Sequence, residues 1–177
     1  RAESKRRLGL DPDRRYLLFP ADPDRPEKRF DRAREVAERA GAELLVGGSI
    51  PPDEMPDWIN AAHGLMVTSD YEGFGLACLE GLACDVPVLS TPVGIAPHAL
   101  RGLDRSLCAE FDPAAWAGFA ADLLAAEDPR TPGRARAEEL SARRMADRVA
   151  LAYDDILRIS EGNRVSAGRL GNDGGIS

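Results

Sequence analysis

Residues 65–89, LMVTSDYEGFGLACLEGLACDVPVL, carry the clearest signals of the fold of this 177-residue chain. They begin with a short apolar run, Leu65–Thr68, and end with a second one, Val86–Leu89. Between these runs, a loop with two glycines precedes the segment Gly75–Ala83, whose apolar residues recur at helical spacing. Short continuous apolar runs are typical of strands that are buried on both faces, as parallel sheets require. The stretch therefore predicts a strand, a loop, a helix and a further strand of a parallel sheet.

Similar apolar runs recur on both sides of this stretch, and helical patterns separate them. Further strands are expected at residues 16–19, 44–46 and 107–109, and further helices at residues 27–40, 55–62, from 113 onward and at 141–159. Strands that alternate with helices indicate a parallel sheet covered on both faces. The sequence therefore predicts an α/β fold, a Rossmann-like doubly wound parallel sheet over residues 1–160. The glycine-rich segment 161–177 has no apolar pattern, and we expect it to be a flexible tail.

Composition and charge exclude several classes of protein. The chain has 30 acidic and 23 basic residues, a net charge of −7, whereas a nucleic-acid binder needs a basic face. No apolar run approaches the length of a membrane-spanning helix, and the charged N-terminus has no signal-peptide core. The three cysteines are odd in number and widely spaced, which favours buried thiols in a reducing compartment. We expect structural or solvent-exposed roles for His63 and His98, and no metal site.

The loop after the 65–68 strand is the strongest candidate for a ligand site, because ligands of open parallel sheets bind beyond the carboxyl ends of the strands. Gly73 and Gly75 let the backbone approach a ligand closely. The unpaired amides from Gly73 to Leu76 would attract a phosphate to the start of the helix. Glu72 could reach the reacting end of such a ligand, and Glu80 could accept hydrogen bonds from a diol. The alternative is that Glu72 only favours the helix dipole and that Glu80 is solvated.

Two other loops open onto the same edge of the predicted sheet. Arg25 and Lys28 follow the first strand and could flank a diphosphate. Thr91 and Gly94 follow the 86–89 strand and offer a hydroxyl and a flexible amide to the same crevice. The alternative is a solvated charged face for the first loop and an ordinary turn for the second.

The residues around the loop that contains Glu72 resemble the carboxyl-terminal donor domain of retaining GT-B glycosyltransferases, in particular the glycosyl transferases group 1 family. The segment Thr68–Leu76 carries the resemblance together with Glu80, because the spacing Glu72-x7-Glu80 is similar to the signature of that family. The other matching positions are Pro26-Glu27-Lys28, Ala83, Pro87-Val88, Thr91, Val93-Gly94 and the terminal helix at 146–157.

The resemblance implies how a nucleotide-diphosphate sugar would be held. Glu72 and Lys28 would be catalytic: Glu72 contacts the donor sugar, and Lys28 holds the diphosphate and stabilises it as the leaving group. Glu80 would bind the ribose hydroxyls. The remaining donor-binding residues would be Arg25, Gly73, Phe74, Gly75, Leu76 and Thr91. Members of the family retain anomeric configuration and need neither a metal nor a cofactor beyond the donor itself.

The resemblance also implies a second domain that has no counterpart in this sequence. In the family, an amino-terminal domain binds the acceptor, a glycan or small molecule, and forms the other wall of the cleft. We therefore expect this chain to be half of a GT-B fold, with little glycosyl-transfer activity on its own. We expect the enzyme to be cytoplasmic, with at most a peripheral membrane association. Asp85 and Ile95 depart from the family by standing where glycine is common. Two alternatives are a sugar-nucleotide epimerase and a non-catalytic module that binds sugar nucleotides or proteins.

Overall fold

The computed structural model describes the backbone of residues 1–169 and the side chains of residues 1–158. The chain divides into two units, Arg1–Glu139 and Leu140–Ser177. The first unit contains a five-stranded parallel sheet with the strand order β2-β1-β3-β4-β5. Its strands are β1 Tyr16–Phe19, β2 Glu43–Val46, β3 Gly64–Val67, β4 Val88–Ser90 and β5 Leu107–Cys108. This order is doubly wound, because the chain moves outward from β1 to β2 and then returns past β1 to β3.

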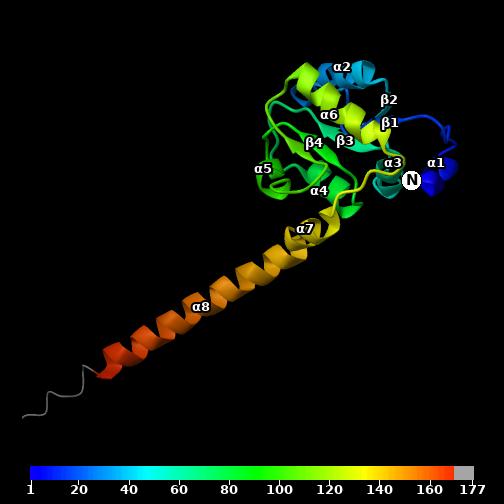
Figure 1. Ribbon diagram of the computed structural model, residues 1–177. Coiled ribbons are helices and arrows are strands. Elements are labelled where there is room, and N and C mark those ends of the chain that lie inside the picture. Colours follow the sequence, from blue (N-terminus) through cyan, green and yellow to red (C-terminus); the bar gives the residue numbers. More distant parts are fainter. Residues whose placement is uncertain (170–177) are drawn as a thin grey trace, which may run out of the picture. The chain divides into compact units, whose positions relative to one another are not determined.

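Helices cover both faces of this sheet (Figure 1). Helices α2 and α6 pack against each other on one face, and α4 lies on the other. The helices of the first unit are α1 Ala2–Arg7, the 3₁₀ turn η1 Pro26–Lys28, α2 Phe30–Ala40, α3 Met55–Ala61, α4 Leu76–Ala83, α5 Ala96–Ala99, α6 Pro113–Ala125 and α7 Gly133–Glu139. The predicted start of α6 is confirmed, because the Asp112 carboxylate accepts a 2.7 Å hydrogen bond from the amide of Ala115. The predicted α/β, Rossmann-like doubly wound fold is confirmed as well.

An apolar core fills the space between the sheet and the layer of α2 and α6. Leu17 and Phe19 of β1 meet Val36 of α2 and Trp116 and Leu123 of α6, and all five side chains are buried. The four residues of β1 are all buried, as a central strand of a parallel sheet requires. Because β1 pairs in parallel with β3, the loops that follow these two strands lie at the same edge of the sheet.

The helix predicted over residues 27–40 is wrong at its beginning, because the chain turns at Arg29. Arg29 lies between η1 and α2 in the left-handed conformation, with φ 52° and ψ 55°. That conformation costs a residue other than glycine about 1–2 kcal/mol, so contacts from elsewhere must hold the turn. The hydroxyl of Thr68 donates to the carbonyl oxygens of Lys28 and Arg29, at 2.9 and 3.0 Å. A helical periodicity along residues 27–40 could not reveal this contact with a distant strand end.

The sequence pattern predicts neither α1 nor α7, which are short and rich in charged residues. Tertiary contacts hold both of them. The ammonium of Lys5, buried beneath α1, donates to two backbone carbonyls of the segment before β1, at 2.8 and 2.7 Å. Helix α7 packs closely on α4, because a Cβ at Gly133 would lie 2.7 Å from the carbonyl oxygen of Leu82. Both helices therefore depend on contacts that a local sequence pattern does not express.

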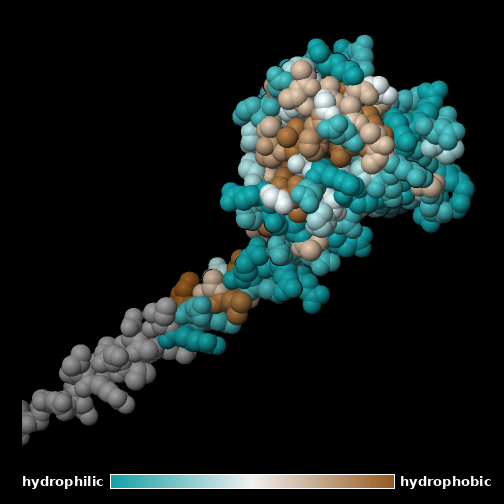
Figure 2. Space-filling model, viewed as in Figure 1, coloured by the Kyte–Doolittle hydropathy of each residue, from teal (hydrophilic) through white to brown (hydrophobic). Residues whose placement is uncertain are grey.

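The second unit contains α8, Ala142–Arg169. Its exposed apolar side chains include Met145, Val149, Leu151, Tyr153, Ile156 and Leu157, and brown spheres mark apolar residues along the coloured part of this helix in Figure 2. The expected long helix is present and is helical past residue 161, where we expected a tail to begin. Residues 170–177 lie outside the described residues, so the tail stays a prediction. No helix in the described part of the chain is long and apolar enough to cross a membrane.

The three cysteines are free thiols that take part in packing. Cys78 is buried, and Cys84 and Cys108 are partly buried. Burial raises the pKa of the Cys78 thiol to about 12 and also raises the pKa of the Cys84 and Cys108 thiols. All three therefore stay protonated at neutral pH and are poor nucleophiles.

His63 is fully buried immediately before β3. The amide of Tyr16 lies 3.3 Å from its Nδ1, and the Arg15 guanidinium lies 3.2 Å from its Nε2. Burial, reinforced by the positive charges of Arg1, Lys5 and Arg15, lowers the pKa of His63 to about 3. The imidazole is therefore neutral in the folded protein and has a structural role, as expected from the sequence.

We expect the chain to become less stable as the pH falls, because of His63. An unfolded histidine takes up a proton near pH 6.5, whereas His63 in the folded state does so only near pH 3. Between these values the unfolded state binds more protons, so the free energy of unfolding decreases as the pH falls, by at most about 1.4 kcal/mol per pH unit from this group. Urea unfolding at pH 4, 5, 6 and 7 measures the slope. The His63→Gln variant should show a flatter slope, and an unchanged slope would contradict the assignment.

Candidate functional site

A cavity of about 540 Å³ opens at the carboxyl ends of β1, β2 and β3. The loop after β1 contributes Asp22, Arg25 and Lys28, and the loop after β2 contributes Gly47, Gly48 and Ile50. The loop after β3 contributes Ser69, Glu72 and Phe74, and the first turn of α4 and Met55 of α3 complete the walls. The cavity therefore lies where a doubly wound sheet places its ligands.

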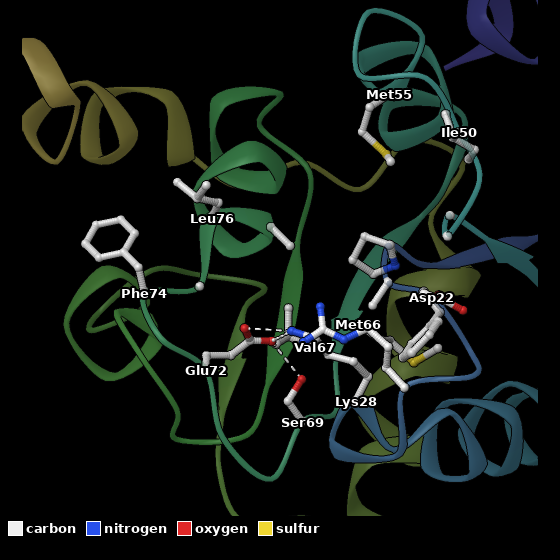
Figure 3. Close-up of a pocket in the computed structure, with 18 residues that line it drawn as sticks. Asp22, Lys28, Ile50, Met55, Met66, Val67, Ser69, Glu72, Phe74 and Leu76 are labelled. Carbon is white, nitrogen blue, oxygen red and sulfur yellow. Dashed lines mark hydrogen bonds and ion pairs between the residues drawn. The ribbon is translucent and has the colours of Figure 1, made fainter.

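Lys28 and Glu72 form an ion pair in this cavity (Figure 3). The Lys28 ammonium lies 2.8 Å from each oxygen of the Glu72 carboxylate. The exposed fractions of the two side chains are 13% and 14%, so water screens this pair less than a surface ion pair. The hydroxyl of Ser69 donates to Glu72 Oε1 at 2.8 Å. The two residues expected to be catalytic are therefore in direct contact, although 44 positions separate them in the sequence.

The amino terminus of α4 is the second polar feature of the cavity. Gly75 precedes the helix in the left-handed conformation, with φ 92°, and no side chain caps this helix start among the described residues. Gly75, Leu76 and Ala77 line the cavity. The first amides of a helix have no partner within the helix and carry partial positive charge. This end of α4 can therefore bind an anion beside the Lys28 ammonium.

Thr91 and Gly94 support the loop between β3 and α4 from behind. Thr91 is buried, does not line the cavity, and donates from its hydroxyl to the Ser69 carbonyl oxygen at 2.6 Å. Gly94 has φ 53°, and a Cβ there would lie 2.4 Å from the Phe74 carbonyl oxygen. The Thr91 hydroxyl therefore holds this loop in place, and its expected direct contact with a donor stays a prediction.

The other predicted site residues differ in their exposure. Arg25 lines the cavity and pairs with Glu27, its side chain 57% exposed. Phe74 and Leu76 also line it and are 40% and 64% exposed. Gly73 and Glu80 are exposed and do not line this cavity. The assignment of Glu80 to the ribose hydroxyls therefore stays a prediction.

Sequence reasoning did not identify several residues of the site. Gly47 and Gly48 let the β2 loop approach the β1 loop, because a Cβ at either position would lie 2.6 Å from the backbone of Pro20 or Asp22. The Gly-Gly pair directly after a predicted strand is a signal that could have found them. Ser69 and Met55 carried no such signal, because their roles depend on which loops meet. Within the described residues, no group of three or more His, Cys, Asp or Glu side chains could hold a metal ion.

The fold and the site together define a Rossmann-like α/β domain with a polar cavity at the carboxyl ends of its strands. The chain belongs to the Glycosyl transferases group 1 family, which matches residues 15–126. The match spans all five strands and the complete cavity. The resemblance to this family that the motif around Glu72 and Glu80 indicated is confirmed.

Among curated relatives, the chain is similar to the D-inositol 3-phosphate glycosyltransferases of Mycolicibacterium vanbaalenii and Thermobispora bispora. It is 42% identical to the first over 90 residues, which cover 49% of this chain and 20% of that protein. It is 33% identical to the second over 169 residues, which cover 73% of this chain and 39% of that protein. The chain therefore spans well under half the length of these relatives.

Solved structures show the same fold. Sucrose-phosphate synthase from Thermosynechococcus elongatus matches with a TM-score of 0.67 and 21% identity, over 90% of this chain and 49% of that one. Anabaena HepE, crystallised with UDP and glucose, matches with a TM-score of 0.64 and 14% identity, over 87% of this chain and 52% of that one. At these identities the likeness concerns the fold alone.

Proposed function

We propose that the first unit binds a nucleotide-diphosphate sugar in this cavity, as the donor domain of a retaining glycosyltransferase. The observation that carries the proposal is the Lys28–Glu72 ion pair beside the uncapped amino terminus of α4. An ammonium and free helix amides suit a diphosphate. A carboxylate held next to them suits the hydroxyl groups of a sugar attached to that diphosphate.

The same arrangement suits transfer of the sugar. Negative charge develops on the departing phosphate in the transition state, and donors that are already oriented stabilise it without rearrangement. Lys28 and the α4 amides are such donors, and Arg25 can add a second cation at the open side of the cavity. Glu72 would contact the sugar, with Ser69 orienting its carboxylate.

The acceptor would be bound outside this chain. The relatives are two and a half to five times as long as the matched portion, as the coverage of 39% and 20% implies. Two walls are needed to exclude water and orient an acceptor. We therefore propose that transfer requires a further domain. The epimerase alternative would need acid–base groups such as histidine in the cavity, and neither His63 nor His98 lines it.

A titration with nucleoside diphosphates tests this function. Saturating UDP, GDP or ADP, added separately to the 177-residue chain, should shift the amide NMR signals of residues 72–80 and raise the melting temperature. At ten times the Kd, the preferred nucleotide should stabilise the fold by about 1.4 kcal/mol. No shift in those amides with any of the three would overturn the proposal.

The Glu80→Ala variant tests the ribose contact within the same titration. If Glu80 accepts hydrogen bonds from the ribose, its removal should weaken nucleotide binding by about tenfold. Glu38→Ala, at an exposed position of α2, is the matched control and should bind like the wild type. Equal affinities for both variants would remove the ribose role while leaving the cavity assignment intact.

A further inference from the structure

Thr68 is a fully buried polar residue, and its two neighbours in the sequence, Val67 and Ser69, line the cavity. It follows β3, and its hydroxyl donates to the carbonyl oxygens of Lys28 and Arg29 in the loop after β1. These two carbonyls belong to the end of η1 and to the left-handed turn that redirects the chain into α2. The hydroxyl therefore connects the end of one strand to the backbone of the residue that carries the Lys28 ammonium.

A second set of contacts joins the same two loops. The amide of Asp70 donates to the Glu27 carbonyl oxygen at 2.9 Å. The Asp70 carboxylate pairs with Arg29 at 3.2 Å and with Arg32 at 2.9 Å. The Asp70 and Arg29 side chains are partly exposed, whereas Thr68 is not. Water competes for exposed ion pairs and not for a buried hydrogen bond. Water therefore weakens the hydrogen bonds from Thr68 less than it weakens the ion pairs of Asp70.

We infer that the Thr68 hydroxyl is a positioning group for Lys28, which it holds against Glu72 and at the depth where the diphosphate binds. The inference rests on the proposed function for its ligand, but the ion pair that it supports is a feature of the chain itself. Without the hydroxyl, the left-handed turn at Arg29 loses its buried donor. The Lys28 backbone can then shift, and a shift of its ammonium by about 1 Å is enough to weaken an oriented interaction.

The Thr68→Val variant removes the hydroxyl and keeps the shape of the side chain. Its affinity for the preferred one of UDP, GDP and ADP should fall by about tenfold, while Thr68→Ser should bind within about threefold of the wild type. Thr131→Val is the matched control, because Thr131 is also buried and donates to a backbone carbonyl, that of Asp104, at 2.8 Å. Thr131 does not line the cavity, so this variant should lose stability without losing affinity.

A double-mutant cycle separates positioning from a general loss of structure. In a Lys28→Ala background, Thr68→Val should change nucleotide affinity by less than about twofold, because the group that it positions is gone. Additive effects of the two substitutions would overturn the inference and leave the proposed function standing. If the wild type bound none of the three nucleotides, the proposed function itself would fail.

A measurement without nucleotide tests the positioning role of Thr68 whether or not the chain binds one of the three nucleotides. Lys5 and Lys28 are the two lysines of the chain, so their ammonium signals can be distinguished by NMR. The Lys28 ammonium protons should exchange slowly with water in the wild type and in Thr68→Ser, and at least about tenfold faster in Thr68→Val. Equal exchange in Thr68→Val and the wild type would overturn the positioning role, whatever the nucleotide titration shows.

Discussion

Replacing Lys28 with alanine is expected to weaken the binding of nucleoside diphosphates by about 30- to 100-fold. The substitution removes an ammonium that lies within the cavity and leaves the Glu72 carboxylate without its partner. A hydrogen bond to a charged group contributes about 1.5–3 kcal/mol, and the unpaired carboxylate would repel the incoming phosphates. Isothermal titration calorimetry of the 177-residue chain with the preferred nucleotide measures the loss.

Two companion variants separate the local effect of Lys28 from a change in overall charge. Lys28→Arg keeps a cation at the position and should recover part of the affinity. Arg39→Ala also removes one positive charge, but from an exposed ion pair on α2, and it should leave affinity within about twofold of the wild type. An alanine variant of Lys28 that bound as tightly as Arg39→Ala would show that the ammonium does not hold the diphosphate.

Replacing Glu72 with glutamine is expected to have effects of opposite sign on binding and on transfer. Glutamine removes the negative charge that faces Lys28, so the ammonium becomes free for phosphate, and affinity for the nucleoside diphosphate should rise about three- to tenfold. Under the proposed function the Glu72 carboxylate contacts the sugar, so its loss should lower donor turnover by about 100-fold in a two-domain transferase that contains this domain. Calorimetry on the chain and release of nucleoside diphosphate by the enzyme measure the two effects.

Asp22→Asn is the matched control for this charge change. Asp22 also lines the cavity, and its carboxylate accepts a hydrogen bond from the Asp24 amide that an asparagine oxygen can preserve. This control should leave turnover within about threefold of the wild type. A Glu72→Gln variant with unchanged turnover would disprove the catalytic role of Glu72. If Glu72→Gln lost as much nucleotide affinity as Lys28→Ala, the proposed competition between the Glu72 carboxylate and the diphosphate for Lys28 would be disproved.

The Lys28–Glu72 ion pair determines how the cavity would receive an anion. Glu72 neutralises the charge of Lys28. A diphosphate must therefore displace the carboxylate from the Lys28 ammonium or share the ammonium with it. The helix amides of α4 keep their partial positive charge in either arrangement. The cavity can therefore attract an anion through α4 and release the Lys28 ammonium to it on binding.

Much of this site could be predicted from the sequence because its signals are local. The alternation of apolar runs and helical patterns predicted the parallel sheet, and the glycines around Glu72 predicted a loop that opens a helix. The turn at Arg29 and the helices α1 and α7 could not be predicted in this way. Each depends on contacts with distant segments, such as the hydrogen bonds from Thr68.

Local patterns along the chain were sufficient to establish the fold class, the family and the loops that carry the candidate residues. Which of these residues meet became visible only in the folded molecule. Folding brings Lys28 against Glu72, places Thr91 behind the loop and leaves Glu80 on the exposed side of α4. The difference arises because strand order and register, which depend on packing across the whole sheet, bring the β1 and β3 loops together. Short-range patterns specify each loop but not its neighbour.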